Sequence, residues 1–134
     1  MKLLLMVTAI VEVLAGFALL VIPRLTFSAV LNTPLDTAGA MLAARLSGAA
    51  IIAIAICCWQ SRNIDGANAQ GIVAALLFYH IAAAAVLAYG GVRLGIQSAF
   101  IWPAIVLHSA LAIWSGAWIR WTMRKLQANN QPSE

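Results

Sequence analysis

The chain has 134 residues, of which 63% are hydrophobic and only 9% are charged, and its mean hydropathy is +0.93. This composition excludes an ordinary soluble domain and is typical of a protein that lies mostly within a membrane. The formal net charge is +4. Because the basic residues are spread over loops and the C-terminal tail, with no dense basic stripe, we do not expect nucleic acid as a partner.

Four apolar segments follow one another, each long enough for the roughly 20 residues that a membrane-spanning helix needs. We place these helices at about residues 3–22, 39–59, 71–89 and 98–121. Pro23 ends the first, residues 25–31 are suited to a short interfacial helix, and Gly90-Gly91 ends the third. The sequence therefore predicts an all-α fold: a single antiparallel bundle of four transmembrane helices within residues 1–125, followed by a polar tail at 126–134.

The basic residues other than Arg45 divide unequally between the two sides of the predicted bundle. The side that holds both termini has five of them: Lys2, Arg62, Arg120, Arg124 and Lys125. The other side has Arg24 and Arg93. Since basic residues collect in cytoplasmic loops, both termini are predicted to be cytoplasmic, in a multi-pass protein of the inner membrane surrounded by the lipid bilayer. Trp59, Trp118 and Trp121 fall at the cytoplasmic interface in this orientation.

Each apolar segment carries one ionisable residue, and these are Glu12, Arg45, His80 and His108. Charge within hydrocarbon is costly, so such residues usually face the bundle interior and mark function. A rise of 1.5 Å per residue places three of them near the membrane midplane and Arg45 slightly outward. We predict one polar cluster that binds a ligand or handles protons, which Tyr79 joins through its hydroxyl.

Glu12 and Arg45 allow two interpretations. They form a buried ion pair that holds the first two helices together. Alternatively, they anchor a polar or anionic head group, with Arg45 as hydrogen-bond donor and Glu12 as proton acceptor. The two interpretations are compatible with each other.

The two histidines have three interpretations. They are neutral imidazoles that hydrogen-bond to helix carbonyls or to Glu12, or axial ligands of one haem b, or members of a proton relay. Apart from this haem alternative no cofactor and no metal site are expected, because carboxylate-rich and glycine-rich motifs are lacking. The adjacent Cys57 and Cys58 are expected to act as small hydrophobic residues, with transfer of a soft metal ion at the cytoplasmic face as the alternative.

An acid in the first helix, Pro23 at its end, and Ala44-Arg45-Leu46-Ser47-Gly48-Ala49 in the second form a recognisable pattern. This pattern resembles small four-helix inner-membrane proteins of bacteria, a loose group that includes the DoxX-like proteins. The resemblance covers mainly the first two helices. It implies a bacterial inner-membrane location, and no catalytic residue is carried over from it.

The sequence thus favours a small inner-membrane protein that binds a hydrophobic ligand or a membrane partner through its polar cluster. One alternative is a redox protein with haem or a quinone at His80 and His108. Others are a proton-coupled transporter subunit in which Glu12 titrates, or a membrane enzyme that uses Glu12 and a histidine as acid and base on a lipophilic substrate. Whether the chain is an enzyme stays open. Its alanine- and glycine-rich helix faces would permit a homo-oligomer.

Overall fold

The computed structural model describes residues 1–64 and 67–129, and these residues form five helices and no strand. The helices are α1 (Lys2–Val21), α2 (Pro23–Leu31), α3 (Ala38–Ser61), α4 (Ala67–Arg93) and α5 (Ile101–Asn129). All but α2 are long and apolar enough to cross a membrane. This confirms the predicted all-α fold with four candidate spans, and makes the chain a multi-pass membrane protein.

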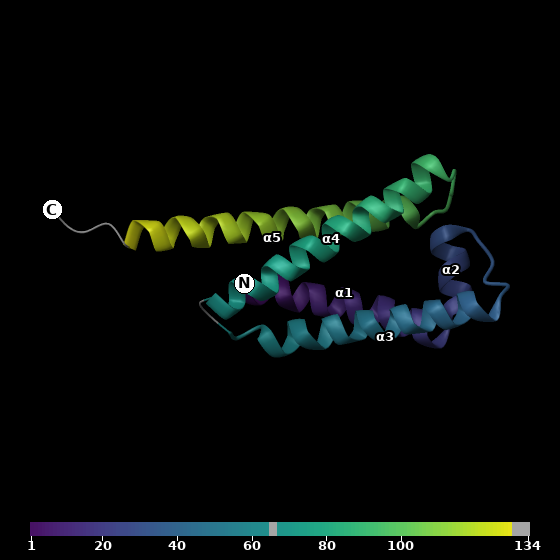
Figure 1. Cartoon of the computed structure of the whole chain (residues 1–134), viewed down its shortest axis with the longest axis horizontal. Coiled ribbons are helices and arrows are strands. Elements are labelled where there is room, and N and C mark those ends of the chain that lie inside the picture. Colours follow the sequence, from purple (N-terminus) through teal and green to yellow (C-terminus); the bar gives the residue numbers. More distant parts are fainter. Residues whose placement is uncertain (65–66, 130–134) are drawn as a thin grey trace.

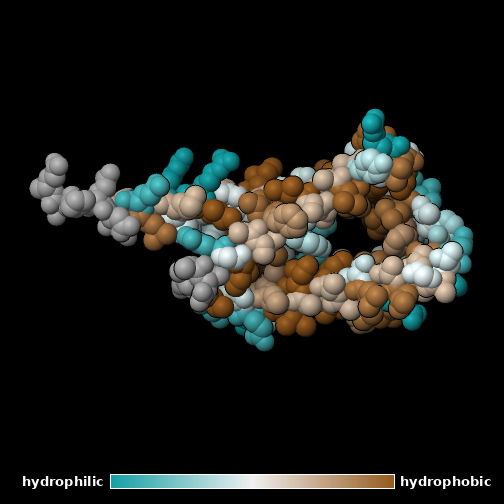
Figure 2. All heavy atoms as spheres, viewed as in Figure 1, coloured by the Kyte–Doolittle hydropathy of each residue, from teal (hydrophilic) through white to brown (hydrophobic). Residues whose placement is uncertain are grey.

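The four long helices pack as two antiparallel pairs, α1 with α3 and α4 with α5 (Figure 1). Contacts within each pair are extensive, whereas contacts between the pairs are few. We call the end where α1 begins and α5 ends the N-terminal end, and the opposite end the α2 end. The pairs diverge toward the α2 end, where Figure 2 shows an opening between them. Apolar atoms cover most of the visible outer surface, and hydrophilic atoms gather at the two ends.

The two pairs meet through apolar side chains in the half of the bundle near the N-terminal end. One core cluster contains Leu5, Ala9, Cys58 and Leu76, and a second contains Leu4, Val73 and Leu111. Every one of these residues lies on the N-terminal side of the Glu12 level. The bundle is therefore packed on one side of that level and divided into its two pairs on the other.

Two glycines fix the register of α1 against α3. A Cβ atom on Gly16 would lie 2.7 Å from the carbonyl oxygen of Gly48, and one on Gly48 would lie 2.7 Å from that of Gly16. No real Cβ atom tolerates such a contact with backbone, so the two helices cross where neither has a side chain. The level of Gly16 on α1 is thus the level of Gly48 on α3.

Several helix ends differ from the predicted ones, and α4 begins at Ala67 rather than at residue 71. Residues 23–31 do form the short helix α2, which begins at Pro23. In contrast, α4 continues through Gly90 and Gly91 to Arg93, because both glycines are buried beneath the loop and the start of α5, against Ile101. The two glycines therefore pack against the start of α5 and do not end the helix.

The last helix begins and ends later than predicted. It starts at Ile101 rather than at 98, and residues 126–129 of the predicted polar tail are helical. In the turn just before these residues, the ammonium group of Lys125 lies 3.9 Å from the centre of the Trp121 ring, which is a cation–π contact. The remaining residues of that tail, 130–134, lie outside the described part of the chain.

Ser98 connects the two helix pairs at the α2 end. Its hydroxyl accepts a hydrogen bond from the backbone N–H of Ile101 at 3.1 Å and donates one to the carbonyl of Val30 in α2. Ser98→Ala is therefore expected to lower the free energy of unfolding by about 1–2 kcal/mol, because it removes a helix cap and leaves a carbonyl unpaired. Denaturant titration in detergent measures the change.

Ser47→Ala is the matched control for this prediction. The hydroxyl of Ser47 is exposed and donates only to the carbonyl of Ala43, one turn earlier in its own helix. That substitution is expected to change stability by less than about 0.5 kcal/mol. Equal effects of the two substitutions would contradict a linking role for Ser98.

Candidate functional site

Glu12 lies in the middle of α1 and is almost completely buried, with 1% of its surface exposed. Thr8 and Gly16 lie one turn before and after it, and both are buried as well. Residues four apart share one helix face, so this face of α1 carries the acid into the bundle. The opposite face carries large exposed apolar residues such as Leu14, which suits contact with lipid.

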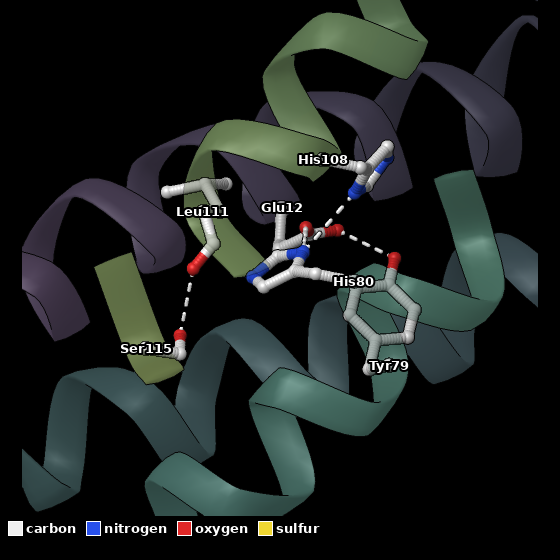
Figure 3. Close-up of polar contacts among 6 residues, drawn as sticks. All are labelled: Glu12, Tyr79, His80, His108, Leu111 and Ser115. Atoms are coloured by element: carbon white, nitrogen blue, oxygen red, sulfur yellow. Dashed lines mark hydrogen bonds and ion pairs between the residues drawn. The ribbon is translucent and has the colours of Figure 1, made fainter. Parts of the chain in front are cut away.

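Tyr79 on α4 anchors one oxygen of this carboxyl group. Its hydroxyl donates a hydrogen bond to Oε2 of Glu12 at 2.8 Å (Figure 3). The bond joins α1 to α4, two helices that otherwise touch little. Tyr79, which the sequence places in the cluster, therefore contacts Glu12 through its hydroxyl.

His80 follows Tyr79 on α4 and is fully buried. Its Nδ1 atom lies 4.0 Å from the second oxygen of Glu12, Oε1. The same Nδ1 also lies 3.1 Å from Nδ1 of His108 on α5. Side chains from α1, α4 and α5 thus point toward one another at one level of the bundle, as Figure 3 shows.

The short distance between the two Nδ1 atoms restricts where protons lie. It is a hydrogen bond only when one ring carries a proton at Nδ1 and the other presents a lone pair there. The neutral rings of His80 and His108 must then be in opposite tautomers. Tyr79 packs against both of them, with ring centres 5.1 Å from His80 and 5.9 Å from His108.

Three buried polar atoms of this region have no hydrogen-bond partner within the described residues: Thr8 Oγ1, Glu12 Oε1 and His80 Nε2. An unpartnered buried polar group costs about 1–3 kcal/mol, and natural proteins contain few of them. Here three lie on neighbouring turns and facing helices. The cluster can therefore form more hydrogen bonds than the described residues provide partners for.

Arg45 does not join the cluster, and the predicted ion pair with Glu12 is wrong. Within the described residues no lysine or arginine forms an ion pair with Glu12, whose nearest basic group is the His80 imidazole, and Arg45 is exposed. The register set by Gly16 and Gly48 explains this, because it puts Arg45 roughly 10 Å along the bundle from Glu12. Arg45 instead borders a cavity at the α2 end, together with Arg24.

The two histidines do not fit the haem alternative in this arrangement. Axial imidazoles bind iron from opposite faces of a porphyrin, so their nitrogens stand on the order of 4 Å apart, twice a metal–nitrogen bond, with the macrocycle between them. Here the Nδ1 atoms touch at 3.1 Å and the ring centres are 5.3 Å apart. The two rings contact each other directly, so a porphyrin between them would require the side chains to move apart.

An apolar groove between α3 and α4 reaches the cluster, and the sequence did not reveal it. Its volume is about 470 Å³, and its lining includes Cys57, Cys58 and Tyr79 among aliphatic and small residues. Tyr79 thus faces the groove with part of its ring and the acid with its hydroxyl. Cys58 is buried in the core and Cys57 is exposed, and both residues line this groove.

Comparison with known proteins adds no information about this site. No protein-family model, no curated protein and no solved structure matches this chain. The resemblance to DoxX-like proteins therefore stays a prediction from the motifs of the first two helices.

Proposed function

We propose that this chain is a small protein of the bacterial inner membrane that binds a lipophilic molecule with a hydroxyl- or carbonyl-bearing head. The head lies at Glu12, Tyr79 and His80, and the apolar part lies in the groove between α3 and α4. The observation that carries the proposal is the pair of unpartnered buried atoms, Glu12 Oε1 and His80 Nε2, together with the groove lined by Tyr79, the hydrogen-bond partner of Glu12.

The chemistry of these atoms limits the head group. When Glu12 is ionised its carboxylate only accepts hydrogen bonds, so Oε1 then requires a donor such as a hydroxyl. Nε2 of His80 donates or accepts according to its tautomer. A groove of about 470 Å³ is in the usual range for a small-molecule site, and its apolar lining suits a hydrocarbon tail. A quinol meets these requirements, as does another lipophilic alcohol.

The distribution of basic residues supports a cytoplasmic location of both termini. Lys2, Arg62 and the basic residues of the last turns of α5 lie at the N-terminal end, which has five basic side chains. Near the α2 end lie Arg24, Arg45 and Arg93. The N-terminal end therefore still has more basic residues than the α2 end, although the difference is smaller than the sequence predicts. The aromatic side chains of Trp59 and Trp121 accompany the basic residues, as at a membrane interface.

Binding of decylubiquinol to the protein in lipid nanodiscs tests the proposed function. The probe is kept reduced under anaerobic conditions and compared with decylubiquinone, which lacks the hydroxyl donors. We expect saturable binding of decylubiquinol in excess of lipid-only discs, and weaker binding of the quinone. Tyr79→Phe is expected to weaken decylubiquinol binding by about 10-fold, the equivalent of one hydrogen bond that orients the acid.

Tyr89→Phe is the matched control, because Tyr89 lies on the same helix but is 57% exposed. It is expected to leave the affinity unchanged. Absence of saturable binding by the unmodified protein would contradict the proposed function. So would an equal loss in both tyrosine variants, since it would place the probe away from Glu12.

A further inference from the structure

Glu12, His80 and His108 offer three ligand atoms that converge on one point. One atom of each residue, a carboxylate oxygen and two imidazole nitrogens, lies within 4.8 Å of the other two. Imidazole nitrogen and carboxylate oxygen suit first-row transition metals, and two histidines with one carboxylate form a recurrent protein site for such ions. The sequence does not show this convergence, because the three residues come from three separate helices.

The charge of the site favours a cation there. Glu12 is buried near the middle of a candidate span, and within the described residues no lysine or arginine pairs with it. An isolated carboxylate in such surroundings is strongly unfavourable unless a positive charge compensates it. The groups that do face it are two imidazoles and the Tyr79 hydroxyl, which present lone pairs or a hydrogen-bond donor rather than a fixed positive charge.

The distances fit an ion between the two rings. With metal–nitrogen bonds of about 2.1 Å, Nδ1 atoms 3.1 Å apart subtend an angle of about 95° at the metal, near the right angle of octahedral coordination. Oε1 of Glu12, now 4.0 Å from Nδ1 of His80, must approach by about 1 Å to complete the set. The rotatable bonds of the glutamate side chain allow this while Tyr79 keeps hold of Oε2.

We propose that Nδ1 of His80, Nδ1 of His108 and the carboxylate of Glu12 bind one divalent first-row transition-metal ion. Tyr79 holds the carboxylate in place through its hydrogen bond to Oε2, the kind of outer contact that ligating carboxylates usually have. The set supplies three ligands, so further coordination positions stay open to an oxygen atom of a bound molecule. The metal site goes beyond the proposed function, because it requires no lipophilic ligand.

Metal binding is tested with Co²⁺ on chelator-treated protein in detergent. Because His80 and His108 are the two histidines of the chain, a histidine-free affinity tag removes every other imidazole. We expect one Co²⁺ per chain by elemental analysis and visible d–d absorption. His108→Gln, at the half-buried position, is expected to lower the affinity at least about 100-fold, because it removes a direct ligand. Circular dichroism and gel filtration are used to check that this variant is folded.

Nitrogen NMR of the histidine-labelled protein gives a second readout that needs no variant. Without metal, the bond between the two Nδ1 atoms requires one ring protonated at Nδ1 and the other at Nε2. Zn²⁺ bound at both Nδ1 atoms is expected to leave both rings protonated at Nε2 alone. Unchanged histidine signals in the presence of Zn²⁺ would overturn the proposal.

The two thiols provide the control for the metal experiment. Soft thiolates also bind these ions, and Cys57 and Cys58 line the neighbouring groove. A Cys57→Ser, Cys58→Ala double variant is expected to keep its Co²⁺. Loss of Co²⁺ in that variant with retention in His108→Gln would overturn the proposal. Decylubiquinol binding is measured separately with chelator present, so failure of the metal proposal does not decide the proposed function, although both involve Glu12 and His80.

Discussion

Gly16→Ala is expected to lower the free energy of unfolding by about 1–3 kcal/mol, although alanine is the better helix former. The added Cβ atom would lie 2.7 Å from the carbonyl oxygen of Gly48, 2.8 Å from a side-chain carbon of Ile52 and 3.0 Å from its backbone nitrogen. A side-chain rotation relieves only the second of these contacts. The helices must therefore move apart, which weakens the packing of α1 on α3 along its length.

Gly71→Ala is the control that separates this effect from helix propensity. A Cβ atom there meets nothing within 4 Å, and Gly71 lies within α4. The substitution is expected to stabilise the protein by up to about 1 kcal/mol. Denaturant titration of both variants in the same detergent measures the difference in sign. Stabilisation by Gly16→Ala would show that α1 and α3 do not cross at these glycines.

The helices themselves were predictable because hydropathy and length dominate their formation in a membrane. Residues 39–59 and 71–89 contain long apolar runs that leave no alternative to helix, and both lie within helices α3 and α4. Their ends were less predictable. Gly90-Gly91 has the same sequence signature whether it ends a helix or receives Ile101 against its surface, and only tertiary packing distinguishes the two.

The members of the cluster were predictable from depth, but their partners were not. Rise per residue placed Glu12, His80 and His108 at one level, and the structure brings these three together. Arg45 differs by only a few residues in predicted depth, within the uncertainty of helix ends. What excludes it is the contact of Gly16 with Gly48, which sets the register of α1 against α3, and a single helix contains no information about register.

A double-mutant cycle on Glu12 and Tyr79 is expected to give a coupling free energy of about 1.5–3 kcal/mol. That is the usual strength of a hydrogen bond to a charged group, and the Tyr79 hydroxyl donates to Glu12 Oε2 at 2.8 Å. Glu12→Leu leaves this hydroxyl buried without its acceptor, and Tyr79→Phe in the same chain removes the unpaired group. The sign of the stability change caused by Glu12→Leu alone is not informative, because replacing a buried acid by a hydrophobic residue also removes the cost of desolvating the acid.

The same cycle with Arg45→Met in place of Tyr79→Phe distinguishes the observed site from the ion pair that the sequence predicts. Arg45 lies roughly 10 Å along the bundle from Glu12, so the two substitutions are expected to be additive within about 0.5 kcal/mol. A buried ion pair would instead couple them strongly, since removing one partner leaves the other charge uncompensated. Coupling at Arg45 without coupling at Tyr79 would therefore require a different register of α1 on α3, and with it a different set of residues around the acid.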